Sequence, residues 1–170
     1  KGWELTLSWR DKFNIAEKPL NYSFRASLAD SRAKILKYNN PDKLLSDYYA
    51  GQVIGEIWGY ETEGFFIDDA DVAAHAKQSP EMRASPTNIW YAGDIKLKDR
   101  NTDGFINRGN NTVNKPGDRF IIGNSSPRYT FGINLDLDYR NFFFSTFFEG
   151  VGKQDWYPST EAEFFWGQYN

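Results

Sequence analysis

The chain has 170 residues, a formal net charge of −3, one histidine and no cysteine. The acidic balance argues against a protein that binds nucleic-acid phosphates, and the lack of cysteine excludes disulfide bonds and thiolate metal sites. Aromatic residues make up 18% of the sequence, which suits either a membrane barrel wall that points rings at lipid or a secreted glycan-binding sandwich. No run of about 18 apolar residues is present, so we expect no transmembrane helix.

Two segments near the N-terminus alternate between apolar and polar residues, which is the period of a β-strand with one apolar face. The apolar positions are Trp3, Leu5, Leu7 and Trp9 in the first segment, and Tyr22, Phe24, Ala26 and Leu28 in the second. We expect an antiparallel hairpin with a polar connection at residues 11–19 and a second strand that continues through residues 31–38. A hairpin that packs one face on a soluble core fits these residues equally well.

Residues 39–127 are irregular and rich in Gly, Pro, Asn and Asp, and such a stretch is far longer than an ordinary loop. One helix is predicted near Asp68–Gln78, where Asp68 caps the N-terminus and Asp71 lies in the first turn. His75 is expected on the surface of this helix, with no nucleophile beside it. No catalytic constellation is therefore predicted, and we expect no enzyme activity.

Four aromatic side chains before this helix allow more than one interpretation. They are Trp58, Tyr60, Phe65 and Phe66. We expect them to form a small core of the segment itself, although they could instead stack on a sugar or pack against a protein partner.

An acidic loop follows, with oxygen-bearing side chains at every second position. A calcium loop takes its oxygen ligands at alternate positions and a glycine at the sixth. The matching ligands here are Asp99, Asn101, Asp103, the Phe105 carbonyl and Asn107, with Gly104 at the turn. Asn110 at the twelfth position cannot give the bidentate carboxylate that closes such a loop. Oxygen ligands favour Ca²⁺ over Zn²⁺, and the alternative is an Asx-rich turn held by side-chain-to-backbone hydrogen bonds.

The last hairpin is predicted at residues 128–149. Its first strand places an apolar residue at every second position, at Tyr129, Phe131, Ile133, Leu135, Leu137 and Tyr139. A tilted membrane strand needs about 9–11 residues, and membrane interfaces favour tyrosine. A two-residue turn at Arg140–Asn141 would pair Tyr139 with Phe142 and Leu137 with Phe144. Leu135 and Leu137 would then face lipid, with Asp136 and Asp138 in a polar interior.

Six segments together resemble, in order, the C-terminal half of the SusC/RagA-type TonB-linked outer-membrane transporters. They are GWELTLSWRDK, YSFRASLADSRAKILKY, IGEIWGYETEGFF, GDIKLKDRNTDGFIN, DRFIIGNSSPRYTFGINLDLDY and FFFSTFFEGVGKQD. The resemblance implies an all-β fold, with antiparallel strands of a large transmembrane β-barrel and a long extracellular loop containing a short helix. It also implies import of oligosaccharides or peptides, powered through TonB, with a SusD-like surface lipoprotein as partner.

Under this resemblance the chain is a fragment of a longer protein in the outer membrane of a Gram-negative bacterium. Residues 1–38 would be a barrel strand pair, 39–127 an extracellular loop region, 128–149 a barrel hairpin, and 150–170 the start of the next extracellular loop. The plug and the TonB-contacting segment match nothing in this sequence.

One departure from the family pattern concerns the acidic loop, which usually runs into a closing Asp-Arg within a few residues. Here residues 108–117 intervene before Asp118 and Arg119. The resemblance implies that Asp118 folds back to complete a structural Ca²⁺ site, and a flexible insert would disfavour the strict octahedron of Mg²⁺. The competing function is a secreted, calcium-stabilised carbohydrate-binding β-sandwich module, which should fold in water on its own.

Overall fold

The computed structural model describes residues 1–79 and 89–157, and the chain divides into two compact units. One unit comprises Lys1–Ala33 and Ser125–Asn170, and the other comprises Lys34–Asn124. The second unit is therefore an insertion between two parts of the first. Among the described residues, no helix is long and apolar enough to cross a membrane.

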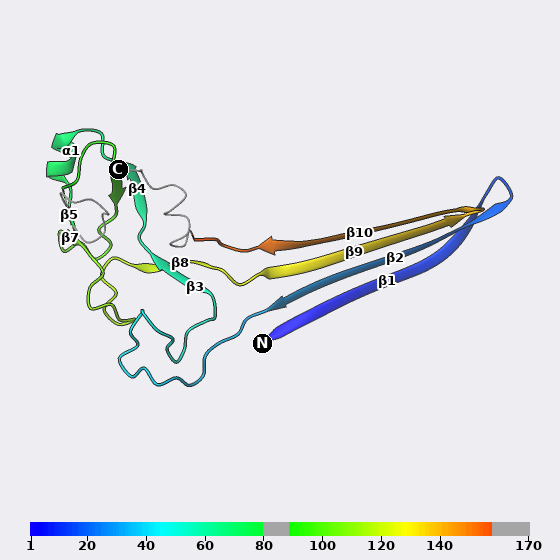
Figure 1. Ribbon diagram of the computed structural model, residues 1–170, viewed down its shortest axis with the longest axis horizontal. Helices are drawn as coiled ribbons and strands as arrows, with labels where there is room; N and C mark the ends of the chain where they lie inside the picture. Colours follow the sequence, from blue (N-terminus) through cyan, green and yellow to red (C-terminus); the bar gives the residue numbers. More distant parts are fainter. Residues whose placement is uncertain (80–88, 158–170) are drawn as a thin grey trace, which may run out of the picture. The chain divides into compact units, whose positions relative to one another are not determined.

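The first unit is a four-stranded sheet in which every neighbouring pair is antiparallel (Figure 1). Its strands are β1 (Gly2–Ile15), β2 (Lys18–Ser31), β9 (Arg128–Tyr139) and β10 (Phe142–Lys153), and the order in the sheet is β1-β2-β9-β10. Both predicted hairpins are present, and Tyr139 pairs with Phe142 as expected. The structure adds a contact that the sequence analysis did not specify, because β2 also pairs with β9 from Leu20↔Tyr139 to Ala29↔Thr130.

The prediction of a polar connection at residues 11–19 is wrong. β1 continues to Ile15 and β2 begins at Lys18, so the turn contains only Ala16 and Glu17. The apolar alternation skips Asp11 but resumes at Phe13 and Ile15, and the Phe13 ring lies edge-on to the Tyr22 ring at 6.0 Å. One acidic residue on the apolar face therefore masked the strand period.

The other end of this hairpin also differs from the prediction. β2 ends at Ser31 and does not continue to Tyr38. The chain leaves the sheet there, and Lys34 forms an isolated bridge with Val53 in the second unit. At the C-terminal hairpin, β10 extends to Lys153, four residues beyond the predicted limit of 149.

The second unit contains short elements, joined by irregular backbone, and it holds one short helix. β3 (Glu56–Gly59) pairs with β8 (Phe120–Asn124), and β4 (Thr62–Phe65) pairs with β6 (Ile95–Leu97), both antiparallel and each with an irregular register. β5 (Lys77–Gln78) pairs in parallel with β7 (Phe105–Ile106). The helix α1 spans Asp69–Ala74. The fold described is thus all-β with almost no helix, and this one parallel pair is its exception to antiparallel pairing.

The predicted helix at Asp68–Gln78 is correct at its start and too long at its end. The Asp68 side chain accepts a hydrogen bond from the Asp71 backbone N–H, as an N-cap does. His75 is the C-cap and has an extended backbone conformation. Soon after it, Lys77 and Gln78 form β5, which pairs with β7 in a separate two-stranded sheet. The alanine-rich sequence favours a helix, and pairing of the following residues with β7 ends it after six residues.

A small core stabilises the second unit. Its buried apolar side chains are Tyr49, Phe66 and Ile106, and its buried polar side chains are Asn40, Gln78 and Asp118. The expected aromatic core is confirmed for Phe66, which is 3% exposed, and is wrong for Phe65, which is 67% exposed. Phe66 directly follows Phe65, the last residue of β4, and neighbouring residues of extended backbone point to opposite sides, so only one of the two rings faces inward.

Candidate functional site

The sheet of the first unit has one face that is apolar along all four strands and an opposite face that is polar along β1, β2 and β9. Register places Leu7 beside Ala26, Ala26 beside Ile133, and Ile133 beside Phe148. The apolar face is formed by Trp3, Leu5, Leu7, Trp9, Phe13, Ile15, Leu20, Tyr22, Phe24, Ala26, Leu28, Phe131, Ile133, Leu135, Leu137, Tyr139, Phe142, Phe144 and Phe148. The four strands are the only described elements of this unit, so none of its described residues forms a second layer over this face.

Many of these side chains are open to the surroundings, including Leu5 at 62%, Trp9 at 59% and Phe148 at 61% exposure. Large contiguous apolar patches are rare on soluble monomers, and they mark a surface that a membrane or another part of a protein covers. Leu135 and Asp136 lie on opposite faces, as the alternation predicts.

The opposite face carries a ladder of polar side chains. Asp136 on β9 accepts hydrogen bonds from Ser23 on β2 at 2.9 Å and from Ser145 on β10 at 2.6 Å. These three residues are directly paired in the sheet, so one carboxylate ties three strands together. At the end of the strands, Asp30 follows Leu28 on the apolar side by register, and the Arg128 guanidinium donates to both of its oxygens.

The acidic loop in the second unit is folded around its own side chains. Asp99 accepts backbone N–H groups from Thr102 at 2.7 Å and Gly104 at 2.8 Å. Asn101 accepts from the Asp103 N–H, and Asp103 accepts from the Phe105 N–H. This is the pattern of consecutive Asx turns. The predicted residues therefore share one tight loop, and their side-chain oxygens are engaged within it.

Asp118 lies against this loop although the sequence separates them. It is fully buried, and its carboxylate accepts backbone N–H groups from Arg100 and Asn107, both at 2.9 Å. The Asp118 N–H in turn donates to the Asn107 carbonyl. The Asn110 N–H donates to the Lys115 carbonyl.

Residues 108–117, expected to be a flexible insert, form backbone hydrogen bonds with another segment of the second unit. This insert is held to residues 43–45 by hydrogen bonds from Leu45 N–H to the Asn111 carbonyl and from Val113 N–H to the Lys43 carbonyl. Gly109 and Gly117 pack closely against each other where the insert folds back on the acidic loop. A Cβ on Gly117 would lie 2.1 Å from the Asn107 carbonyl oxygen, and Gly117 has φ +65°. Only glycine fits there without displacing the backbone.

We tested whether these residues fit a calcium ion. Their donor set consists of carboxylate, amide and carbonyl oxygens, which suits Ca²⁺. No group of three or more His, Cys, Asp or Glu side chains converges on one point among the described residues. Each carboxylate oxygen that binds an N–H keeps a second lone-pair direction, so the loop retains ligand capacity.

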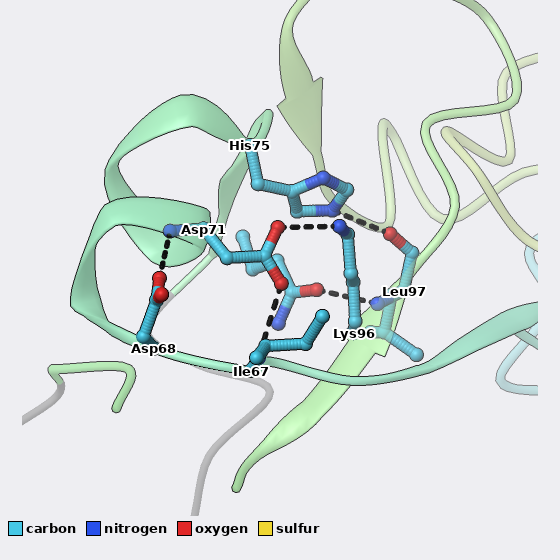
Figure 2. A network of polar contacts seen from close by, with 7 residues as sticks. Ile67, Asp68, Asp71, His75, Lys96 and Leu97 are labelled. Atoms are coloured by element: carbon cyan, nitrogen blue, oxygen red, sulfur yellow. Dashed lines mark hydrogen bonds and ion pairs between the residues drawn. The ribbon is translucent and has the colours of Figure 1, made fainter. Parts of the chain in front are cut away.

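Helix α1 and strand β6 are joined by a charged network (Figure 2). Lys96 Nζ lies 2.7 Å from Asp71 Oδ1, while Asp71 Oδ2 accepts the Ile67 N–H at 3.1 Å. The hydrogen bond from Lys96, followed by the one from the Ile67 backbone, lowers the pKa of Asp71. His75 Nε2 lies 2.7 Å from the Leu97 carbonyl oxygen. His75 is therefore a half-buried bridge between elements, in contrast to the predicted helix-surface position.

Other polar residues that stabilise this unit were missed by the sequence analysis. Gln78 spans the β6 backbone, donating to the Ile95 carbonyl and accepting the Leu97 N–H at 2.6 Å. Glu61 binds Lys98 and Arg100, and its hydrogen bond with Lys98 is the main cause that lowers the pKa of its carboxyl. These partners lie far apart in sequence, so no local pattern marks them.

An apolar pocket of about 640 Å³ lies beside the acidic loop within the second unit. Phe66, Val72, Trp90, Phe105 and Ile106 contribute to its lining. Its polar groups are already engaged, since His75 binds the Leu97 carbonyl and Trp90 Nε1 donates to the Gln78 carbonyl at 3.1 Å. The pocket therefore offers shape and apolar surface but few polar contacts that would define a ligand.

Comparison with known proteins gives two relatives of the same description. No family model matches the chain. It is 26% identical over 162 residues to TonB-dependent receptor P3 of Formosa agariphila, across 88% of this chain and 14% of the relative. It is 24% identical over 162 residues to TonB-dependent receptor P26 of the same organism, across 89% of this chain and 14% of the relative.

The chain thus spans about 14% of the length of each of these relatives. The similarity nevertheless extends over most of the chain and includes both units. It supports a TonB-dependent receptor family and does not single out the SusC/RagA type.

Proposed function

We propose that the four-stranded sheet is part of the β-barrel wall of a TonB-dependent outer-membrane transporter. The observation that carries this proposal is the continuous exposed apolar face on four paired strands, opposite a polar face. Strands of outer-membrane barrels alternate in this way between lipid and lumen. The names of the two relatives support the same role, and TonB-dependent receptors are transporters and not enzymes.

The edges of the sheet support a wall better than a sandwich. β1 and β10, with 14 and 12 residues, are the outer strands and have no described partner on their outer sides. Long unpaired edges favour aggregation in water and are not tolerated in lipid, and barrel closure removes them. A β-sandwich module would instead need a second sheet on the apolar face.

The experiment is expression of residues 1–170 alone. A wall fragment should give aggregate or detergent-dependent material, because its apolar face and both edges need the rest of the barrel. A monomeric product that melts cooperatively in water without detergent would contradict the barrel and favour the carbohydrate-binding module. Cooperative melting is measured by circular dichroism, and the monomer by light scattering.

The finer assignment within this proposal is a SusC/RagA-type importer of oligosaccharides or peptides with a SusD-like lipoprotein partner, coupled to TonB through other parts of the protein. The ends of the sheet at which the connections lie support an extracellular position for residues 39–127. The two tight turns lie at one end of the sheet, whereas the long insertion leaves from the other end. Outer-membrane barrels place short turns in the periplasm and long loops outside. Co-purification of a surface lipoprotein with the tagged transporter checks the partner.

A structural Ca²⁺ in the acidic loop is the second part of the proposal. Asp99, Asn101, Asp103, the Phe105 carbonyl and Asn107 would hold the ion, with Asp118 as the buried anchor that keeps the loop closed. The ion would supply positive charge among clustered carboxylates and order the loop.

Calcium should therefore protect the loop from proteolysis, and Asp103→Ala should abolish that protection. Asp94→Ala is the control, since Asp94 lies outside the loop. Protection that is independent of calcium in the unmodified protein would favour the self-sufficient Asx turn.

A further inference from the structure

The pocket beside the acidic loop in the second unit has the size of a ligand site. Its volume is about 640 Å³, and ligand pockets in proteins occupy about 300–1,000 Å³. Phe66 and Ile106 in its lining are buried, whereas Ile89 and Phe105 are each 54% exposed. The lining therefore runs from the core of the unit to its surface, so a group entering from solvent meets apolar side chains at depth.

The polar groups of this pocket are engaged with the protein itself. Gln78 uses both ends of its side-chain amide on the backbone of β6, and Trp90 Nε1 donates to the Gln78 carbonyl. His75 Nε2 is bound to a carbonyl oxygen of β6, and both ends of the Asn107 amide contact backbone groups two residues away. A sugar ring carries several hydroxyls, and each one that is buried needs a hydrogen-bond partner. The pocket therefore favours an apolar side chain over a sugar.

Lys77 brings a positive charge to the pocket. Its Nζ lies 5.9 Å from the centre of the Phe105 ring, and no ion pair joins it to another described residue. The carboxylates at the start of α1 and in the acidic loop lie outside the lining. Those of Asp71 and Asp103 are bound to a lysine of β6 and to the Phe105 N–H. Charge complementarity therefore calls for a carboxylate beside the apolar group that enters.

We propose that this pocket is a peptide-binding site, in which an aromatic or aliphatic side chain of the cargo packs against Trp90 and Phe105 while a neighbouring carboxylate meets Lys77. This inference rests on the proposed function, which allows both oligosaccharides and peptides as cargo, and it selects peptides. A peptide joins an apolar side chain and a carboxylate on consecutive residues, which is the pair of groups that the lining accepts.

The first test measures binding to the complete transporter in detergent by isothermal titration calorimetry. The probe is the peptide acetyl-Gly-Phe-Asp-Gly-amide. Replacing its phenylalanine by alanine should weaken binding roughly tenfold, because the contact with the aromatic lining is lost. Replacing its aspartate by lysine should weaken binding roughly threefold, because the charge then opposes Lys77. A neutral glucose hexasaccharide that binds more tightly than the probe overturns the choice of peptides.

Two matched pairs of variants locate the site. Ala73 and Ala74 are both exposed on α1, but only Ala73 lines the pocket. Ala73→Trp should fill the pocket and weaken binding of the probe roughly tenfold, whereas Ala74→Trp should leave it unchanged. Phe105→Ala should also weaken binding, and Phe65→Ala is its control, since Phe65 is an exposed ring of the same unit outside the lining. Equal effects within each pair overturn the assignment of the pocket.

The same preparations separate failure of this inference from failure of the barrel. Heat-modifiable, folded barrel is measured first in outer membranes, and its absence from the unmodified transporter contradicts the proposed wall. A folded barrel that does not bind the probe overturns the peptide site and leaves the wall standing.

Uptake tests whether the bound peptide is cargo. Cells that make the transporter should accumulate the radiolabelled probe, and Ala73→Trp should reduce this uptake while Ala74→Trp does not. Binding at the pocket without any difference in uptake between these two variants contradicts the role in cargo reception.

Discussion

Two residues in the β1–β2 turn have backbone conformations that disfavour their side chains. Ala16 and Glu17 have φ values of 47° and 66°. Both values are positive, as the two central positions of a type I′ turn require. Asn-Gly is the usual choice there, and a residue with a Cβ costs about 1–2 kcal/mol in the left-handed region. The turn is therefore held by pairing along the two strands and not by its own preference.

Replacing Ala16 by Asn together with Glu17 by Gly should stabilise the assembled protein by about 1 kcal/mol, because the strain is relieved. The measurement is the urea midpoint of unfolding in detergent. Asn14→Gly, placed in the adjoining strand, should shift the midpoint in the opposite direction. An unchanged or lower midpoint in the double variant would show that the turn is not strained.

The Asp71–Lys96 pair makes the second unit sensitive to acid. The pKa of Asp71 is lowered by the hydrogen bond from Lys96, so the folded state favours the ionised carboxylate. Stabilisation is thus present above the ordinary carboxyl pKa of about 3.9 and is lost as pH falls through the lower folded-state value.

Asp71→Asn should remove this pH dependence and lower the stability of the second unit only slightly at neutral pH, since the pair is partly exposed. Hydrogen exchange of the Ile67 amide, which donates to Asp71, reports the local opening. Asp69→Asn, in the same first turn, is the control. If both variants exchange alike, the Lys96 contact does not stabilise the helix.

Some of these residue-level features follow from the sequence and some do not. Spacing alone placed Asp99, Asn101 and Asp103 in one loop, because alternate Asx residues bind neighbouring backbone. The approach of Asp118 came only from the family resemblance. No sequence pattern predicted the roles of Gln78 and Glu61, because their hydrogen-bond and ion-pair partners depend on how β4, β5 and β6 meet in space.

At the scale of elements, period-two alternation predicted both hairpins and the faces of their strands. The alternation failed to predict the strand where a polar residue stands at an apolar position, as Asp11 does in β1. It also failed in the second unit, where the strands contain only two to five residues. The pairing of β2 with β9 could not be predicted from the sequence, because turn chemistry does not fix the register of two strands that a long insertion joins.

The face assignment of β9 gives a test with neighbouring residues. Leu135→Arg places a charge on the apolar face and should cost about 2–4 kcal/mol at a membrane midplane. Asn134→Arg places the same charge on the polar face and should be milder. The amount of heat-modifiable, folded barrel in isolated outer membranes is the readout. Equal loss from both variants would mean that the lipid-facing side is wrongly assigned.

At the scale of the whole molecule, the chain interrupts one sheet with a self-contained unit. β2 and β9 are direct neighbours although residues 32–127 separate them in sequence. Closing such a long loop adds only slowly to the entropic cost of pairing, because that cost grows with the logarithm of loop length. The sheet is therefore compatible with insertions of very different size between β2 and β9.

This arrangement has a consequence for evolution. The insertion leaves and rejoins the sheet at paired positions, close to Ala29 and Thr130. A unit with its own core and adjacent ends can be exchanged, shortened or enlarged by recombination without changing the register of the strands that carry it. The four strands of the sheet can thus be inherited as a block while the unit inserted between them changes in size and content.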